Sequence, residues 1–541
     1  MHYLLLTLIL GLGAVLRFFN LDLKPLWLDE VITALFSLGK NFNNVPVDVL
    51  FSPHNLSPLF RLNPEISCAT IANNLHQQST HPPLFFCLTH SWLTFLSPLT
   101  QSLTWKLRAF SALIGVAEIG AVYYLNRLAF SRQVGLVGAG LMATSPFAVY
   151  LSQEARHYTL PMFLITLGLI CLIKIQQNLQ KQQLNPLVWL SWIGVNSLSL
   201  YTHYFGILAL IAQIITLLCL ILYLPKTKKE KLINLASLSL SVLVIIAFFF
   251  PWLPILLEHF TSPKTSWLPS PQHILPLLQI IAAWSTTIIV LPVENQPLKI
   301  QIISIIFTIA FGVWIAWQTW RGFRQLRQQK HFSISTFTLT CFLTIVLLEF
   351  LALVYGLKKD ITVVPRYSFI YFPAFECLLA ASLTTKKSQN TFPFSVTCIG
   401  IISSLFVTFN LAFQKPFVPA AVANHFNQFP EAVLIVFPYD NSLDLALGLS
   451  YALALKDARP ENRETNFVFL NNSSEQEKLW QKISQLPVSP TNLWLIAPGF
   501  LDESFPPSIQ ITKGTQCNID NSQFYRLGSY PYQLYRCNIG L

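Results

Sequence analysis

The sequence predicts an α-helical, polytopic membrane protein with about 11 transmembrane helices and a small C-terminal α/β domain. Of its 541 residues, 53% are hydrophobic and only 11% are charged, and the mean hydropathy is +0.51. Soluble domains carry roughly 25% charged residues, so this composition excludes an ordinary soluble protein. Several apolar runs reach the roughly 20 residues that a helix needs to cross a bilayer.

The basic residues predict how the chain is oriented in the membrane. The formal net charge is +11, but the positive residues fall in short clusters between apolar runs, which is not typical of a nucleic-acid-binding protein. The clusters are Arg127/Arg132, Lys174/Lys181, Lys226/Lys228/Lys229/Lys231, Arg321/Arg324/Arg327/Lys330 and Lys386/Lys387. Loops rich in lysine and arginine face the cytoplasm. All of these clusters lie on that side only if the apolar segments 84–96 and 274–293 do not cross the membrane. This predicts a cytoplasmic N-terminus and an extracytoplasmic C-terminus.

The predicted membrane domain comprises residues 1–413. Its spans are 3–19, 107–125, 134–150, 159–175, 186–200, 207–224, 232–252, 300–320, 335–357, 367–383 and 394–413. The first apolar segment lacks a basic start and a small-residue cleavage site, which favours a retained helix over a signal peptide. Residues 20–106 follow it as a long extracytoplasmic loop with surface helices.

A change of composition at residue 414 predicts a separate soluble domain, 414–541. The predicted strands are 432–437, 466–470 and 492–497, and the predicted helices are 443–455 and 475–484. This alternation is typical of a small α/β domain. Cys517 and Cys537 lie in its polar part and can form a disulfide if the domain is extracytoplasmic.

Two adjacent acids, Asp29 and Glu30, are the first candidates for chemistry. Carboxylates close to the membrane face are costly unless they are solvated or used. An attacking hydroxyl group needs a base, and a carboxylate can serve as one. A structural role fits as well, in which Asp29 caps a helix covering 30–38.

Two further motifs lie at the predicted outer ends of spans. His81 precedes Pro82 and Pro83, which fix a turn at the start of a helix, so His81 either bonds a phosphate or sugar or is a solvated loop residue. Glu154, Arg156 and Tyr158 lie between two spans. Arg156 can hold a phosphate by paired hydrogen bonds, or it can be an interfacial arginine paired with its neighbour.

The last two motifs are also at the outer side. His203 lies between Tyr201 and Tyr204, whose positions an aromatic belt alone would explain. Arg366 and Tyr367 open a later span, where the arginine is either a second phosphate ligand or an anchor. In one topology these acids, histidines and arginines share the depth at which a charged lipid headgroup would bind.

The order of these motifs resembles the GT-C glycosyltransferases. The likeness is closest to bacterial members of glycosyltransferase family 39, relatives of protein O-mannosyltransferases and of aminoarabinose lipid A transferases. The matching elements are Leu16-Arg17, Leu26 to Glu30, His81-Pro82-Pro83-Leu84, Leu107-Arg108, Ser111-Ala112-Leu113, Ser145-Pro146-Phe147, Ser152 to Tyr158 and Pro365-Arg366-Tyr367. The resemblance covers residues 1–205 well and the rest of the membrane part loosely.

The resemblance implies an enzyme that transfers a hexosyl or pentosyl group, with inversion, from a polyprenyl-phosphate-linked donor at the outer face of a bacterial plasma membrane. It implies Asp29 as the base, Glu30 as its companion and Glu154 at a second acidic position that is often Asp. The residues expected to bind the donor's phosphate or sugar are His81, Arg156, Tyr158, His203, Arg366 and Tyr367. The expected partners are this donor, membrane lipids, and a glycan, lipid or protein acceptor, with no nucleic acid.

No cofactor is required by the sequence. Asp29, Glu30 and Glu154 could bind a divalent cation through oxygen, but no spacing demands a metal, and arginine can meet the phosphate charge instead. The C-terminal domain matches no family domain, so the resemblance does not imply a particular acceptor.

Two other classes stay open. A transporter or flippase of lipid-linked sugars also needs many spans, although the lack of an evident internal repeat and the paired acids count against it. A non-catalytic membrane scaffold would use the C-terminal domain to bind partners.

Overall fold

The computed structural model of the chain describes residues 1–225, 227–262, 268–329, 333–385, 391–472, 476–488, 490–497, 505–511, 514–527 and 530–539. The chain divides into two compact units. The first unit comprises 1–21, 75–92 and 105–413, and the second comprises 22–74, 93–104 and 414–541. Lys226, Lys330, Lys386 and Lys387, which were predicted to face the cytoplasm, lie outside the described residues.

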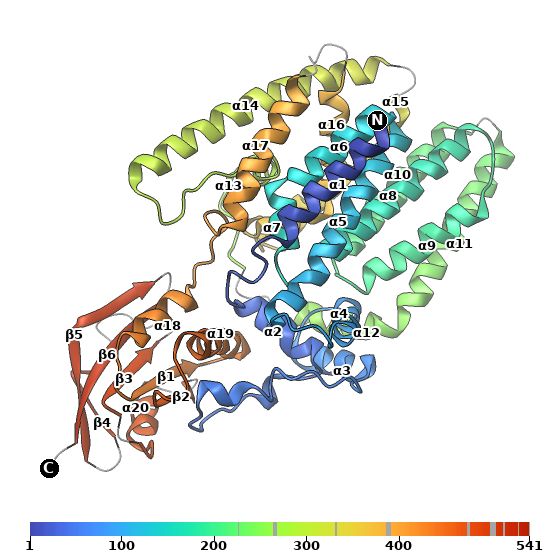
Figure 1. Cartoon of the computed structure of the whole chain (residues 1–541). Coiled ribbons are helices and arrows are strands. Elements are labelled where there is room, and N and C mark those ends of the chain that lie inside the picture. The colour runs from blue at the N-terminus through green and yellow to red at the C-terminus, as the bar shows by residue number, and fades with distance from the viewer. Residues whose placement is uncertain are drawn as a thin grey trace. The chain divides into compact units, whose positions relative to one another are not determined.

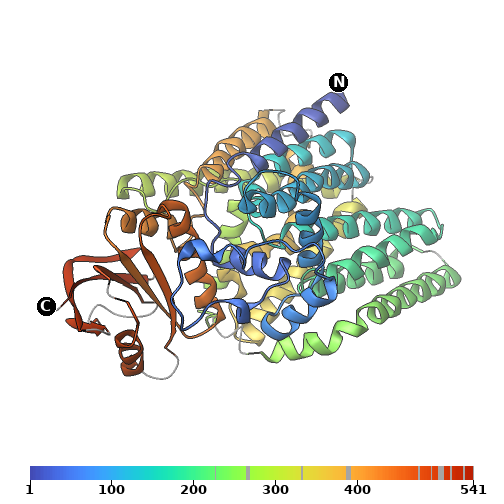
Figure 2. The same cartoon turned by 60° about the horizontal axis from the view of Figure 1, so that its bottom comes forward.

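The first unit is a bundle of helices that run side by side (Figure 1, Figure 2). Its α-helices are α1 (His2–Phe18), α4 (Leu84–Phe95), α5 (Leu103–Ala129), α6 (Arg132–Thr144), α7 (Pro146–Ser152), α8 (Thr159–Gln180), α9 (Pro186–Leu200), α10 (Gly206–Tyr223), α11 (Lys228–Phe249), α12 (Leu253–Thr261), α13 (Leu275–Thr286), α14 (Leu298–Gln328), α15 (Ser333–Gly356), α16 (Phe372–Leu383) and α17 (Thr391–Thr408). Short 3₁₀ helices are η3 (Phe250–Trp252), η5 (Ile361–Val363) and η6 (Pro365–Ile370).

The lengths of these helices bear on the predicted number of spans. Within the described residues, six helices are long and apolar enough to cross a membrane, or seven if the bent pair α6 and α7 is one span. The chain is therefore a polytopic helical membrane protein. The predicted total of about 11 spans also needs the shorter apolar helices α1, α9, α16 and α17 to cross. Helices α4 and α13, which are predicted not to cross, have 12 residues each, the same length as α16, so helix length does not test this prediction.

The predicted span 134–150 is broken into two helices. Helix α6 ends at Thr144, and α7 starts at Pro146 with a bend of 58° between them. Proline lacks the N–H that a continuous helix would need, and its ring clashes with the preceding turn. Arg17 from α1 satisfies the carbonyls at this break, with 2.8 Å to the oxygen of Met142 and 3.0 Å to that of Ala143.

A glycine allows the long helix α14 to approach α16 closely. A methyl group at Gly322 would collide with the backbone carbonyl of Ser382. Most of the remaining α14 surface is exposed, so this helix contacts the bundle mainly along one side. The close approach at Gly322 is therefore a main attachment of α14.

The second unit contains a six-stranded sheet within the described residues (Figure 1). Its strands are β1 (Val433–Tyr439), β2 (Thr465–Asn471), β3 (Asn492–Ile496), β4 (Ser508–Ile511), β5 (Thr515–Leu527) and β6 (Tyr530–Ile539), in the order β2-β1-β3-β6-β5-β4. Strands β2, β1 and β3 are parallel, and the other pairs are antiparallel. Its helices are α2 (Leu28–Ser37), η1 (Phe42–Asn44), η2 (Pro53–Leu56), α3 (Cys68–Gln78), α18 (Pro419–Asn427), α19 (Ser442–Ala458) and α20 (Gln476–Ser484).

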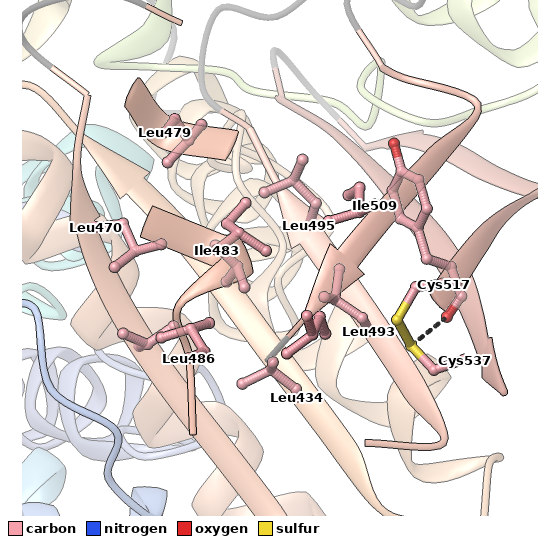
Figure 3. Close-up of a cluster of buried hydrophobic side chains, with 14 of the residues drawn as sticks. Leu434, Leu470, Leu479, Ile483, Leu486, Leu493, Leu495, Ile509, Cys517 and Cys537 are labelled. Atoms are coloured by element: carbon pink, nitrogen blue, oxygen red, sulfur yellow. Dashed lines mark hydrogen bonds between the residues drawn. A yellow bond between two sulfur atoms is a disulfide. The ribbon is translucent and has the colours of Figure 1, made fainter. Parts of the chain in front are cut away.

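One face of this sheet packs against α20. Leu479 and Ile483 of α20 lie on Leu434 of β1 and Leu493 of β3 (Figure 3). A disulfide between Cys517 and Cys537 joins β5 and β6 beside this core. The predicted pairing of these two cysteines is therefore present in the structure.

The C-terminal domain is only partly the α/β domain that the sequence predicts. The three predicted strands and two predicted helices are present as β1, β2, β3, α19 and α20. Strands β4, β5 and β6 and helix α18 were not predicted, and they turn the parallel sheet into a mixed one. The fold prediction is thus confirmed for the helical membrane part and needs correction here.

Part of the predicted outer loop 20–106 pairs with this sheet. Isolated bridges join Val47 to Phe469 and Phe51 to Phe467, both on the edge strand β2. Helix α2 packs against α19 of the same unit. Loop residues and residues 414–541 consequently share one fold.

Candidate active site

The loop between α7 and α8 carries most of the candidate residues. The amide of Gln153 donates hydrogen bonds to the carbonyl oxygens of Leu16, at 3.2 Å, and Phe19, at 2.9 Å. The hydroxyl of Ser111 donates to the carbonyl of Arg156 at 3.2 Å. These bonds attach the loop to the end of α1 and to α5.

Tyr158 brings together two arginines from distant parts of the sequence. The guanidinium carbons of Arg156 and Arg366 each lie 5.7 Å from the centre of its ring. The Nε of Arg366 also donates a hydrogen bond of 2.9 Å to the Tyr158 hydroxyl. Arg366 is in the 3₁₀ helix η6, where Pro365 sets the backbone direction. Two positive groups thus lie close to one aromatic ring.

Three histidines extend this cluster. The ring of His157 lies 4.8 Å from that of His81 and 4.8 Å from that of His203, measured between ring centres. The Nδ1 of His81 is 2.8 Å from the hydroxyl of Ser79. Its Nε2 is 3.5 Å from a guanidinium nitrogen of Arg156. The His-Pro-Pro turn therefore belongs to the same cluster as the arginines.

Burial and nearby positive charge keep two of these histidines neutral. Burial, followed by the charge of Arg156, lowers the pKa of His157 well below its usual range. The same two causes lower the pKa of His203 to about 3. Neither ring nitrogen of His157 has a hydrogen-bond partner among the described residues. A neutral imidazole buried next to two arginines can bond an anion without adding further charge.

Aromatic side chains form one wall of the cluster. The ring of His203 is 5.0 Å from that of Phe369 and 6.2 Å from that of Tyr367. Phe369 is fully buried, whereas Tyr367 is half-buried. The cluster thus combines positive, neutral polar and apolar surfaces.

Six residues predicted to bind the donor gather in this one place, and the structure adds two. The six are His81, Arg156, Tyr158, His203, Arg366 and Tyr367. The prediction missed His157 and Phe369. The sequence signal for His157 was its position between Arg156 and Tyr158, whereas no local pattern distinguishes Phe369.

The predicted acids occupy two units. Asp29 and Glu30 lie in the second unit, on α2, where Asp29 is 9% exposed and Glu30 is fully buried. Glu154 is in the loop of the first unit, and its carbonyl accepts a 2.7 Å hydrogen bond from the backbone N–H of Arg156.

The proposed helix cap at Asp29 is wrong. Helix α2 begins at Leu28, one residue before Asp29, and the capping position is Trp27. The carboxylate of Glu30 accepts a 3.3 Å hydrogen bond from the backbone N–H of Trp27. Because Glu30 satisfies a free N–H of the first turn, the capping role belongs to it and not to Asp29.

A metal centre finds no support in the part of the chain that the structure describes. There, no three His, Cys, Asp or Glu side chains form a group that could hold a metal ion. The positive charge at the cluster comes from arginine side chains.

Comparison with known proteins gives one family match. Residues 80–255 match the family described as dolichyl-phosphate-mannose-protein mannosyltransferase. This segment includes His81, Glu154, Arg156, Tyr158 and His203. The comparison with curated proteins finds no match.

Solved structures of one similar protein share the fold. The ArnT from Cupriavidus metallidurans bound to undecaprenyl phosphate superposes with a TM-score of 0.54 and 11% identity, covering 98% of this chain and 97% of that one. Its structure in the apo state gives a TM-score of 0.52 and 12% identity with the same coverage. At this identity the likeness is one of fold.

These comparisons confirm the resemblance that the motifs indicated. The family match supports the predicted likeness to family 39 membrane glycosyltransferases. It also confirms the prediction of an enzyme that depends on a polyprenyl-phosphate-linked sugar. The fold match extends over the C-terminal domain, for which the sequence alone indicated no relative.

Proposed function

We propose that this chain transfers a sugar from a polyprenyl-phosphate-linked donor to an acceptor hydroxyl at the extracytoplasmic membrane face. The observation that carries the proposal is that Arg156 and Arg366 both lie 5.7 Å from the ring centre of Tyr158, at the ends of membrane helices. The family match and the structure of an ArnT that holds undecaprenyl phosphate support the same class of donor.

The donor phosphate would bind at the two arginines. A guanidinium group can present two parallel N–H donors to a phosphate, and paired arginines would neutralise its charge. His157 and His203 would contribute neutral hydrogen-bonding groups beside it. Bound phosphate would also accept a hydrogen bond from the protonated ring nitrogen of neutral His157, which is costly to bury without a partner.

The reaction would be a single displacement. The acceptor oxygen forms a bond to the anomeric carbon as the bond from that carbon to the phosphate oxygen breaks. Asp29 takes the acceptor's proton, and the negative charge that develops on the leaving lipid phosphate is met by Arg156 and Arg366. Attack from the face opposite the leaving group inverts the configuration. The cap that Glu30 makes to Trp27 favours a structural role for Glu30 beside the base.

The proposed orientation places the N-terminus in the cytoplasm and residues 414–541 outside. The disulfide between Cys517 and Cys537 supports this placement, because disulfides persist in oxidising compartments. The distribution of basic clusters supports it independently. Eleven spans in residues 1–413 would fit both.

Replacement of the base tests the proposal. We expect Asp29→Asn to lower turnover about 10²–10⁴-fold, measured as transfer of labelled sugar from lipid donor to acceptor by purified protein. Asp22→Asn, the same change at an exposed acid of the same segment, is the matched control and should keep full activity. Near-normal turnover of folded Asp29→Asn protein would remove Asp29 as the base. Movement of labelled lipid across the membrane without bond cleavage would favour a flippase instead.

A further inference from the structure

We infer that the C-terminal domain positions the proposed base by holding helix α2, with Ser450 as the main positioning residue. This inference rests on the proposed function, because it assigns the domain a part in the same reaction. It concerns contacts within the second unit, to which both α2 and residues 414–541 belong. It also supplies a role for a domain whose sequence indicated none.

The first contact is at the start of α2. The hydroxyl of Ser450, in α19, donates a hydrogen bond to the carbonyl oxygen of Leu26. Ser450 is fully buried and Leu26 is 6% exposed, so water does not compete for this bond. Leu26 lies three residues before Asp29, which means that the bond fixes the backbone immediately ahead of the acid.

The second contact is on the ring of Trp27, the capping residue of α2. The Nζ of Lys415 lies 4.0 Å from the centre of this ring, a close cation–π distance. The backbone N–H of Trp27 is bonded by Glu30 at 3.3 Å. Ring and backbone of Trp27 are thus held from two sides, one of which is the segment that leads into the C-terminal domain.

The third contact follows the end of α2. The N–H groups of Asp48 and Phe51 donate to the carbonyls of Phe469, at 2.9 Å, and Phe467, at 3.0 Å. The carbonyl of Phe51 accepts from the N–H of Phe467 at 2.8 Å. The chain is therefore bonded to the domain both before and after the helix.

The packing of α2 completes the support. Residues 29 to 37 of this helix are all buried, and its neighbour in the unit is α19. The hydroxyl of Thr33 donates to the carbonyl of Asp29 at 3.1 Å within the helix. A helix held at its start, along its length and beyond its end has little freedom to shift, and a shift of about 1 Å at a catalytic group can cost about 10²-fold in rate.

Ser450→Ala removes one hydrogen bond and leaves the packing unchanged. We expect it to lower kcat roughly 5- to 50-fold while the KM for the lipid-linked sugar changes less than about twofold, because the base shifts and the phosphate site does not. We also expect faster hydrogen–deuterium exchange in residues 28–37. Lys415→Met should likewise lower kcat and speed up the exchange of residues 28–37.

Tyr535→Phe is the matched control. The Tyr535 hydroxyl donates to the carbonyl of Pro506 at 3.0 Å, so this variant also loses one side-chain bond to a carbonyl in the same domain, away from α2. It should leave kcat and the exchange of residues 28–37 unchanged. If Ser450→Ala and Tyr535→Phe behave alike in both measurements, the positioning role is wrong.

The variant Asp29→Asn separates the two possible failures. If it retains turnover, the base assignment of the proposed function fails, and the positioning of a base fails with it. If Asp29→Asn is inactive and Ser450→Ala is indistinguishable from its control, only the positioning role is overturned.

Discussion

Two arginines that are far apart in the sequence share one aromatic ring. Arg156 lies in the short loop after α7, whereas Arg366 is the second residue of a 3₁₀ helix before α16. Because both guanidinium groups lie close to Tyr158, a phosphate bound beside this ring could contact both fixed cations. The identity of these two residues as arginine should therefore matter more than their charge alone.

The variant Arg366→Lys tests this expectation. Lysine keeps the charge but loses the planar fork and the bond to the Tyr158 hydroxyl. We expect kcat/KM for the lipid-linked sugar to fall roughly 10- to 100-fold, about 1.4–2.7 kcal/mol. Arg321→Lys, the same change at an exposed position of α14, should have no effect. Equal activity of the two variants would contradict a phosphate-binding role for Arg366.

The neutral histidines predict how stability depends on pH. The pKa of His203 is lowered from 6.5 to about 3 in the folded state, so below 6.5 the unfolded chain binds a proton that the folded protein does not. The contribution of His203 to stability is full above pH 6.5, the pKa of this histidine in the unfolded chain, and is lost as the pH falls towards 3. The slope for one group is at most roughly 1.4 kcal/mol per pH unit.

The measurement compares unfolding temperatures between about pH 7 and about pH 4. The wild type should lose stability more steeply on acidification than His203→Asn, which cannot titrate. The comparison uses the slopes, because the substitution also changes packing. Parallel slopes would mean that His203 does not titrate as its burial implies.

Local patterns located most of the candidate side chains but not their roles. His81, Arg156 and Arg366 could be singled out because charged groups at the ends of apolar runs are costly. The capping residue of α2 could not be identified from the sequence, because it depends on the backbone angle at Trp27 and on whether the Glu30 side chain reaches the Trp27 N–H. His157 was overlooked because its environment is made by the turn at His81, helix α4 and the turn at His203 together.

The break between α6 and α7 shows how one element depends on another. Arg17 donates to the carbonyls of Met142 and Ala143, which lose their usual partners where α6 ends. Glu118 and Glu376 interact electrostatically with this guanidinium group inside the bundle. The loop that follows α7 carries Arg156, so the break helps to determine where that loop begins.

Removal of this arginine should destabilise the bundle. We expect Arg17→Met to lower the free energy of unfolding by roughly 3–5 kcal/mol, because it leaves the buried carbonyls of Met142 and Ala143 without their donor. Arg17→Lys keeps the positive charge but makes fewer hydrogen bonds, so its free energy of unfolding should lie between those of the wild type and Arg17→Met. Thermal unfolding in detergent measures all three proteins. An unchanged Tm for Arg17→Met would show that the carbonyls find other partners.

Helices and strands were predictable where apolar residues recur regularly or form an unbroken run in the sequence. Long apolar helices such as α8 and α10, and fully buried strands such as β1, were placed within a few residues. Strands β4 to β6 were missed although exposed Gln510, Gln516 and Asn518 alternate with buried residues, which is the pattern of a half-buried strand. The pairing of β6 with β3, which joins this meander to the parallel strands, is between non-consecutive strands, and no local pattern reports it.

The orientation of the whole molecule can be tested by labelling. Gln510 is exposed on β4, and Lys229 is exposed at the start of α11. In intact cells, a membrane-impermeant maleimide should label Gln510→Cys, whereas Lys229→Cys should react only after permeabilisation. The protein without either substitution gives the background of its own free cysteines. The reverse pattern would place the disulfide-bonded domain in the cytoplasm and overturn the proposed topology.

The close approach at Gly322 has a consequence for how the lipid environment acts on this protein. Besides Gly322, buried Ile315 and Leu326 also pack α14 on the bundle, so the helix is fixed along one side. A change of bilayer thickness is met by helix tilt, and here α14 can tilt only together with α16. A side chain added at Gly322 would push α14 away from the carbonyl of Ser382 and weaken this coupling.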